Sequence, residues 1–118
     1  MSETPTTIRK AIVVDDHAAT RYLAACLLQR RGYEVHTAED GLFALELFSV
    51  QKPNIVFTDL KMPRMTGLEL AAELHKGPYK TRIVLASADH DLLRESRHSV
   101  DAILRKPYTQ AELYQCLE

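Results

Sequence analysis

Cysteine, long apolar runs, a leader segment and an excess of either charge are all missing or scarce in this sequence. The two cysteines, Cys26 and Cys116, lie far apart, which argues against a disulfide framework or a zinc site. The longest apolar run, Tyr22–Leu28, is too short to cross a membrane, and the polar start MSETPTT has no leader-like apolar stretch. We therefore expect a cytoplasmic protein that makes no membrane contact.

The charges are balanced, with 15 Lys plus Arg against 16 Asp plus Glu and a formal net charge of -1. This balance supplies no field that would hold a phosphate backbone, so direct binding of nucleic acid is disfavoured. The length of 118 residues, with 46% hydrophobic and 26% charged residues, is typical of one globular domain. We expect a flexible tail over residues 1–7 and a single domain over residues 8–118.

Apolar runs of strand length alternate with helical patterns five times along the chain. Strands are predicted over residues 8–14, 34–37, 54–58, 82–86 and 102–104. Helices are predicted over residues 18–31, 41–50, 68–75, 91–98 and from Thr109 to Glu118. On the first helix we expect a buried stripe of Leu23, Ala24, Leu27 and Leu28. Strict alternation predicts an α/β fold, a doubly wound five-stranded parallel sheet with helices on both faces.

Polar side chains follow four of the predicted strands at the point where each strand ends. They are Asp15 and Asp16, Asp59, Ser87 and Lys106. If the strand order is 2-1-3-4-5, the first and third strands are neighbours and three carboxylates meet in one crevice. Clustered carboxylates beside one lysine favour a bound divalent cation, and oxygen ligands suit Mg²⁺. The sequence therefore predicts a site for Mg²⁺ and phosphate.

Asp59 is the candidate reactive residue because the central strand, with apolar residues 55–57 behind Asp59, holds its carboxylate at the floor of this crevice. An aspartate carboxylate can attack phosphorus and form an aspartyl phosphate. Lys106 would serve as a counter-ion, and Ser87 could donate a hydrogen bond to a phosphoryl oxygen. Read alone, Asp15 and Asp16 could equally be a solvated pair at a helix start.

These residues resemble the motifs of a two-component response-regulator receiver domain of the CheY-like superfamily. The resemblance covers nearly the whole chain and is carried by Asp15-Asp16, the segment DLKMPRMTG that begins with Asp59, Ser87-Ala88 and Lys106-Pro107. It implies a flavodoxin-like (βα)5 fold with Asp59 as phospho-acceptor. The implied phosphoryl donor is a sensor histidine kinase or a phosphotransfer protein, and the implied reader is a downstream effector or a fused output domain.

The resemblance also implies a Mg²⁺ ligand set of Asp16, Asp59 and the backbone carbonyl of Lys61, with Asp15 acting largely through water. Ser87 and Ala88 would bind phosphate at the switch position, and Lys106 would contact the phosphoryl group. Such a domain is a regulator rather than an enzyme, and it can dimerise on phosphorylation. The face near the fourth helix and fifth strand would change between two states on phosphorylation.

The sequence departs from the family pattern near its fourth helix. Ile103 stands three residues before Lys106, where the family usually has an aromatic switch residue, and Ser99-Val100 replace a common Gly-Ala. Two alternatives therefore stay open. One is a receiver fold that acts as a scaffold without phosphorylation. The other is a small Mg²⁺-dependent phosphohydrolase with aspartyl chemistry, against which Lys61 stands where an acid would be expected.

Overall fold

Five parallel strands form the centre of the molecule. The computed structural model describes residues 8–78 and 80–117, so the tail expected over residues 1–7 lies outside the described residues. The strands are β1 (Lys10–Val14), β2 (Glu34–Ala38), β3 (Ile55–Asp59), β4 (Arg82–Ser87) and β5 (Ala102–Arg105). Their order in the sheet is β2-β1-β3-β4-β5, and every neighbouring pair is parallel. The predicted fold class and strand order are confirmed.

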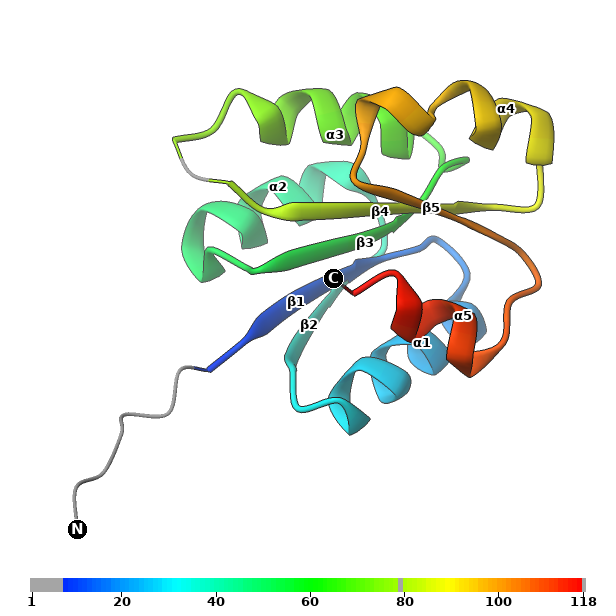
Figure 1. Ribbon diagram of the computed structural model, residues 1–118. Coiled ribbons are helices and arrows are strands. Elements are labelled where there is room, and N and C mark those ends of the chain that lie inside the picture. The colour runs from blue at the N-terminus through cyan, green and yellow to red at the C-terminus, as the bar shows by residue number, and fades with distance from the viewer. Residues whose placement is uncertain (1–7, 79, 118) are drawn as a thin grey trace, which may run out of the picture.

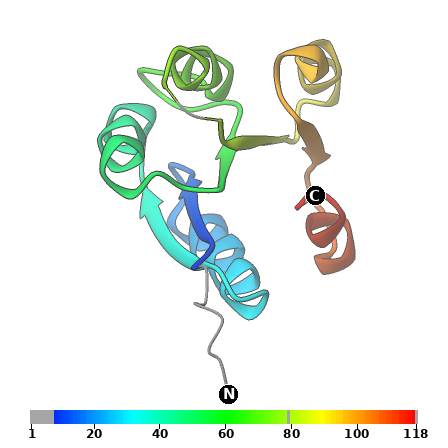
Figure 2. The same ribbon diagram turned by 60° about the vertical axis from the view of Figure 1, so that its left-hand side comes forward.

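The helices cover both faces of this sheet. Helices α1 (Ala18–Arg30) and α5 (Gln110–Gln115) lie on one face, and α2 (Gly41–Gln51), α3 (Gly67–His75) and α4 (His90–Glu95) lie on the other (Figure 1, Figure 2). Alternate residues of each strand explain the two layers, since Ala11 and Val13 pack toward α1 whereas Ile12 and Val14 pack toward α2 and α3. The three central strands, β1, β3 and β4, are thus buried on both faces, as interior parallel strands must be, whereas β2 and β5 at the edges are partly exposed.

Three predicted details are wrong. The helix expected over residues 91–98 is α4 followed by a short 3₁₀ helix, η1 (Arg97–Ser99). The Ser96 hydroxyl donates to the Leu92 carbonyl at 2.9 Å, and the Ser96 amide is shared between two carbonyls, so the α-helix ends there. The helix expected to reach residue 118 ends at Gln115 because the next two amides, of Cys116 and Leu117, bond carbonyls only three residues back.

Leu23 is the third exception, because its side chain is 54% exposed rather than part of the buried stripe. The stripe that α1 buries consists of Ala24, Ala25, Leu27 and Leu28. Leu23 instead lines a cavity with Thr20, Pro107 and Tyr108 beside the carboxyl end of the sheet. Among the described residues, no helix is long and apolar enough to span a bilayer.

Candidate functional site

Three carboxylates meet where β1 and β3 end side by side. The pairing of Val14 with Thr58 brings the residues that follow β1 next to Asp59, the last residue of β3. Side-chain atoms of Asp15, Asp16, His17 and Asp59 that could ligate a metal all lie within 4.8 Å of one another. The structure thus brings the three predicted acids together and adds His17.

Asp59 is held by two donors in a buried position. Its Oδ1 accepts from the Leu60 amide at 3.1 Å and from Lys106 Nζ at 3.2 Å, and the residue is 7% exposed. Burial raises the pKa of this carboxyl, Lys106 opposes the rise, and the charge of Asp15 adds to it. The chain therefore keeps a poorly solvated carboxylate in a fixed orientation at the carboxyl end of β3.

Asp15 is also buried, but hydrogen bonds occupy both of its carboxylate oxygens. Oδ1 accepts from the His17 amide at 2.9 Å, and Oδ2 accepts from the Thr20 hydroxyl at 2.8 Å and from Lys106 Nζ at 3.2 Å. Thr20 was not among the predicted site residues, because a threonine in the first turn of a helix carries no distinguishing pattern. These bonds leave Asp15 little capacity for a direct bond to a cation.

Asp16 is more accessible than its neighbour. Its side chain is 28% exposed, and its carboxylate oxygen lies 3.3 Å from Nδ1 of His17, a side chain that is 74% exposed. This carboxylate can therefore turn toward an ion without breaking buried hydrogen bonds. Oxygen ligands of this kind, with water completing the shell, fit a hard divalent cation such as Mg²⁺.

Lys106 bridges the two buried acids from the end of β5. Its ammonium lies 3.2 Å from both Asp15 Oδ2 and Asp59 Oδ1, and its side chain is 20% exposed. Its backbone amide donates to the Ser87 carbonyl at 2.9 Å, which continues the pairing of β5 with β4. One cation shared by two buried carboxylates offsets part of their mutual repulsion.

Ser87 ends β4 and is 2% exposed. Its Oγ accepts from the Asp89 amide at 3.0 Å, which leaves the hydroxyl hydrogen to be donated elsewhere. Ala88 is exposed beside it and lines the same cavity as Lys106. The predicted phosphate-binding residues therefore lie at the same edge of the sheet as the acids.

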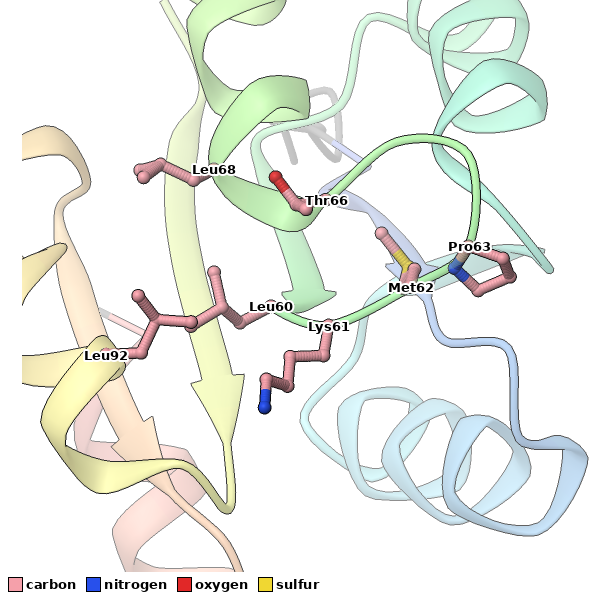
Figure 3. A pocket seen from close by; sticks show the side chains of 7 residues that line it. All are labelled: Leu60, Lys61, Met62, Pro63, Thr66, Leu68 and Leu92. Atoms are coloured by element: carbon pink, nitrogen blue, oxygen red, sulfur yellow. The ribbon is translucent and has the colours of Figure 1, made fainter.

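The Lys61 side chain does not contact the acids. Its ammonium pairs with Asp89 Oδ2 at 3.1 Å, which joins the loop after β3 to the residue that caps α4. Leu60 and Leu92 lie beside it at the wall of an apolar cavity of about 540 Å³ (Figure 3). The sequence does not indicate this ion pair, because the two residues are 28 positions apart and come together only when β3 and β4 pair side by side.

Ile103 packs with Leu60, Leu85 and Leu93 under α4 and is half-buried. Tyr108 follows the Lys106-Pro107 pair and packs its ring edge-to-face on Phe57, with 5.9 Å between the ring centroids. Burial raises the pKa of Tyr108 to about 12, and the nearby charges of Asp15 and Asp59 add to the rise. Tyr108 is therefore a neutral packing residue behind the acids.

Comparisons with known proteins agree with this geometry. The response regulator receiver domain family matches residues 11–118. The transcriptional regulatory protein PdtaR of Mycobacterium tuberculosis is 34% identical over 93% of this chain, which spans 55% of PdtaR's length. Protein PilG of Pseudomonas aeruginosa is 33% identical over 88% of this chain and 81% of its own length.

Solved structures agree as well. A CheY-like receiver domain from Methylobacillus flagellatus superposes with a TM-score of 0.84 at 29% identity, covering 95% of this chain and all of that domain. The chemotaxis response regulator CheY4 of Vibrio cholerae gives a TM-score of 0.84 at 28% identity, covering 94% of this chain and 97% of its own. With the family match, the strand order and the acidic site in agreement, this chain belongs to the response regulator receiver domain family.

Proposed function

We propose that Asp59 accepts a phosphoryl group from a sensor histidine kinase or a phosphotransfer protein, in the presence of Mg²⁺. The observation that carries this proposal is a buried aspartate that shares one lysine with Asp15 and lies within 4.8 Å of Asp16. Asp16, Asp59 and the backbone carbonyl of Lys61 would hold the metal, and Asp15 would act through water. Bound Mg²⁺ would neutralise charge on the phosphoryl oxygens.

In the proposed transfer, a carboxylate oxygen of Asp59 attacks the phosphorus of the donor's phosphohistidine. A new O–P bond forms while the P–N bond breaks, and the electron pair stays on the departing nitrogen. Lys106 already touches Asp59 Oδ1 at 3.2 Å, so its ammonium is placed to stabilise negative charge that moves onto the transferred group. Leu60 N holds Asp59 in place during the attack.

Phosphorylation would then change the charges at the carboxyl end of the sheet. The phosphoryl group carries about two negative charges at neutral pH, in place of the single charge of the Asp59 carboxylate. Ser87 has a free hydroxyl hydrogen for it, and the amide of Asp89 connects Ser87 to the start of α4. The face of α4 and β5 would shift between two populated states, and a downstream effector or an output domain would recognise one of them.

The remaining proposals follow from the same role. Residues 8–118 would act as one receiver domain in the cytoplasm, as a regulator with no substrate turnover of its own, and phosphorylation could drive two copies together. This chain spans 55% of the length of PdtaR, and we extend to it no output of the longer relative.

Incubation with acetyl phosphate and Mg²⁺, followed by intact mass spectrometry, tests this function. We expect one phosphoryl adduct that disappears in Asp59→Asn and is reduced when the metal is chelated. Asp91→Asn removes an exposed carboxylate outside the site and should label like the unchanged protein. An adduct that persists in Asp59→Asn would refute the assignment.

A scaffold that works without phosphorylation is the second candidate, and the observation that favours it is Ile103, an aliphatic residue that cannot make an aromatic switch. Partner binding by wild type and Asp59→Ala, each with and without phosphodonor, separates the two functions. Equal binding in all four states would establish the scaffold. Steady release of phosphate from a small phosphomonoester would instead revive the phosphohydrolase, against which Lys61, paired with Asp89, stands where a second carboxylic acid would be expected.

A further inference from the structure

Two histidines that the proposed function does not use line one small cavity between α3 and η1. The cavity has a volume of about 290 Å³, and its walls are Leu68, Ala72 and His75 from α3 with His98 and Ser99 from η1. The three α3 residues are spaced so that they share one helix face, and α3 contacts η1 (Figure 1). Because helical side chains lean toward the amino end of their helix, His75 leans back toward the turn that holds Ala72.

The ring nitrogens of these two histidines are available for a ligand. Of the five histidines in the chain, His17, His36 and His90 each lie close to a polar group of another residue. His75 and His98 are exposed, and the described part of the chain gives their side chains no hydrogen bond and no ion pair. Two imidazoles without partners thus meet at one cavity.

The backbone that carries His98 is fixed by the residues around it. Ser96 is 2% exposed, and its carbonyl accepts from the Ser99 amide at 3.0 Å. Asp101 bonds Ile83 of β4 twice, because its amide donates to the Ile83 carbonyl at 2.9 Å and its Oδ2 accepts from the Ile83 amide at 2.7 Å. The short η1 is therefore held at both of its ends.

The helix that carries His75 is held just as firmly. A capping box closes the amino end of α3, and its buried face packs on the sheet through Leu70, Ala71 and Leu74. Val100, the residue after η1, packs against the same apolar cluster. Ligands on elements that are already fixed lose little conformational freedom on binding, which favours affinity.

We propose that His75 and His98 bind a divalent transition-metal ion of the class that includes Zn²⁺ and Ni²⁺. Imidazole nitrogen suits these ions, whereas Mg²⁺ prefers oxygen ligands. The Ser99 hydroxyl lies at the same cavity, and water would complete the coordination shell. The set contains no cysteine, so it differs from the cysteine-rich zinc sites that the sequence disfavours. The bound ion would join α3 to the connection between α4 and β5.

An anion fits this cavity less well than a cation. Two protonated imidazoles could in principle hold phosphate. His75, however, is the last residue of α3, and the carboxyl end of a helix carries partial negative charge. This charge stabilises a cation and opposes an anion, so inorganic phosphate is the competing ligand in the test.

Amide NMR spectra of the ¹⁵N-labelled protein, recorded with substoichiometric Ni²⁺ in excess Mg²⁺, locate the ion. Ni²⁺ is paramagnetic and broadens the signals of nearby amides, so we expect signal loss at residues 72–75 and 97–99. Excess Mg²⁺ competes for sites built from oxygen ligands. Loss confined to the surroundings of Asp16 and His17, no loss at all, or a response of residues 72–75 and 97–99 to phosphate but not to Ni²⁺ would overturn the proposal.

Single substitutions show whether both imidazoles are needed. Losing a group outside the ligand set already costs about 10–100-fold in metal affinity, so His75→Ala and His98→Ala should each weaken Zn²⁺ at least about tenfold in calorimetric titration. His36→Ala is the matched control, because it removes an imidazole from β2 that pairs with Glu34 at 2.8 Å, and it should bind like wild type. Weakening in only one of the two cavity variants, or equal weakening in the control, would refute a shared site.

Hydrogen exchange tests whether the ion joins the two elements. Exchange of the Ser99 amide, which donates to the Ser96 carbonyl, should slow when Zn²⁺ is added to wild type but not to His75→Ala. This variant is informative because His75 belongs to α3 and not to η1. Unchanged exchange in wild type would refute the bridge. None of these measurements needs a phosphoryl donor, so their outcome is independent of the proposed function.

Discussion

At the scale of single residues, the site holds two carboxylates in buried positions, where an ionised group usually destabilises the fold. Asp15 and Asp59 are 5% and 7% exposed, and both depend on one ammonium, that of Lys106. Burial and the neighbouring acids raise the pKa of Asp59 against the opposing effect of Lys106. A group with this combination of burial and charged neighbours is characteristic of functional sites rather than of stable cores.

Neutralising Asp59 should therefore stabilise the fold. A carboxyl whose pKa is raised by folding destabilises the folded state once it is ionised, and this cost disappears below the titration range of aspartate. Asp59→Asn should raise the free energy of unfolding by about 1 kcal/mol at neutral pH without Mg²⁺, and the gain should vanish near pH 3. Urea unfolding of both proteins across this range measures it.

Asp40→Asn provides a control of opposite sign. The Phe43 amide and then Arg64 hold the pKa of Asp40 below its usual range, so its charge favours folding. The variant should be less stable than wild type at neutral pH, and the difference should shrink as pH falls through the acid range. Stabilisation by Asp40→Asn, or a pH-independent effect of Asp59→Asn, would contradict this account of the charges.

Gly67 lies against the backbone of Asp59 and has no room for a side chain. A β-carbon at this position would overlap the Asp59 carbonyl oxygen and would lie 2.7 Å from a methyl group of Leu85. Gly67→Ala should lower the free energy of unfolding by about 1–3 kcal/mol and slow phosphorylation, because Asp59 must move. Gly77→Ala, whose nearest contact would be 3.2 Å, should cost less and leave the labelling rate unchanged. The same rate in both variants would show that Asp59 does not move.

At the scale of elements, capping determines where the helices that flank the site begin. Thr66 and Glu69 form a capping box at α3, and Thr109 and Glu112 form another at α5. In both boxes a threonine stands three residues before a glutamate, which is the spacing that marks a helix start. The first has the same spacing in the sequence, so the predicted helix start at residue 68 could have been placed one residue earlier.

Thr66→Ala should cost about 1 kcal/mol of unfolding free energy, because the Glu69 amide loses its partner at 3.1 Å. Thr66→Ser keeps the hydroxyl and should retain most of this stability. Hydrogen exchange should also become faster at Gly67, whose amide donates to the Leu60 carbonyl at 2.8 Å and closes the loop after Asp59. If Thr66→Ser destabilised the protein as much as Thr66→Ala, packing rather than capping would be the cause.

The elements also show what the sequence could and could not predict. Asp15, Asp16, Asp59 and Lys106 were predictable, because the ends of parallel strands meet at one edge whatever the side chains are. The bond of Thr20 to Asp15 and the ion pair of Lys61 with Asp89 were not, since each depends on how a helix start is seated on the sheet. The end of α4 before Ser96 was not predictable either, because it depends on the hydrogen bond that the Ser96 hydroxyl donates to the Leu92 carbonyl.

At the scale of the whole molecule, the acidic site and the fold are linked through the cation that the site would bind. The carboxylates come from β1 and β3, and Lys106 comes from the far end of the chain, so only the folded protein assembles them. A ligand that binds only the folded state raises its stability by an amount set by ligand concentration and affinity. The response of stability to Mg²⁺ therefore reports the site without any phosphoryl donor.

The two adjacent acids should differ in this response. A Mg²⁺ concentration 100 times the dissociation constant should add about 2.7 kcal/mol to the free energy of unfolding of wild type. Asp16→Asn should remove most of this increment, because Asp16 is the accessible carboxylate, with a side chain 28% exposed. Asp15→Asn should remove less, since the Asp15 carboxylate oxygens already accept from His17, Thr20 and Lys106.

The measurement is urea unfolding with and without Mg²⁺. The quantity compared is the Mg²⁺-dependent increment in the free energy of unfolding, because Asp15→Asn also changes the pairing of Lys106. Asp91→Asn should keep the full increment, and a larger loss in Asp15→Asn than in Asp16→Asn would reverse the assignment of the direct ligand.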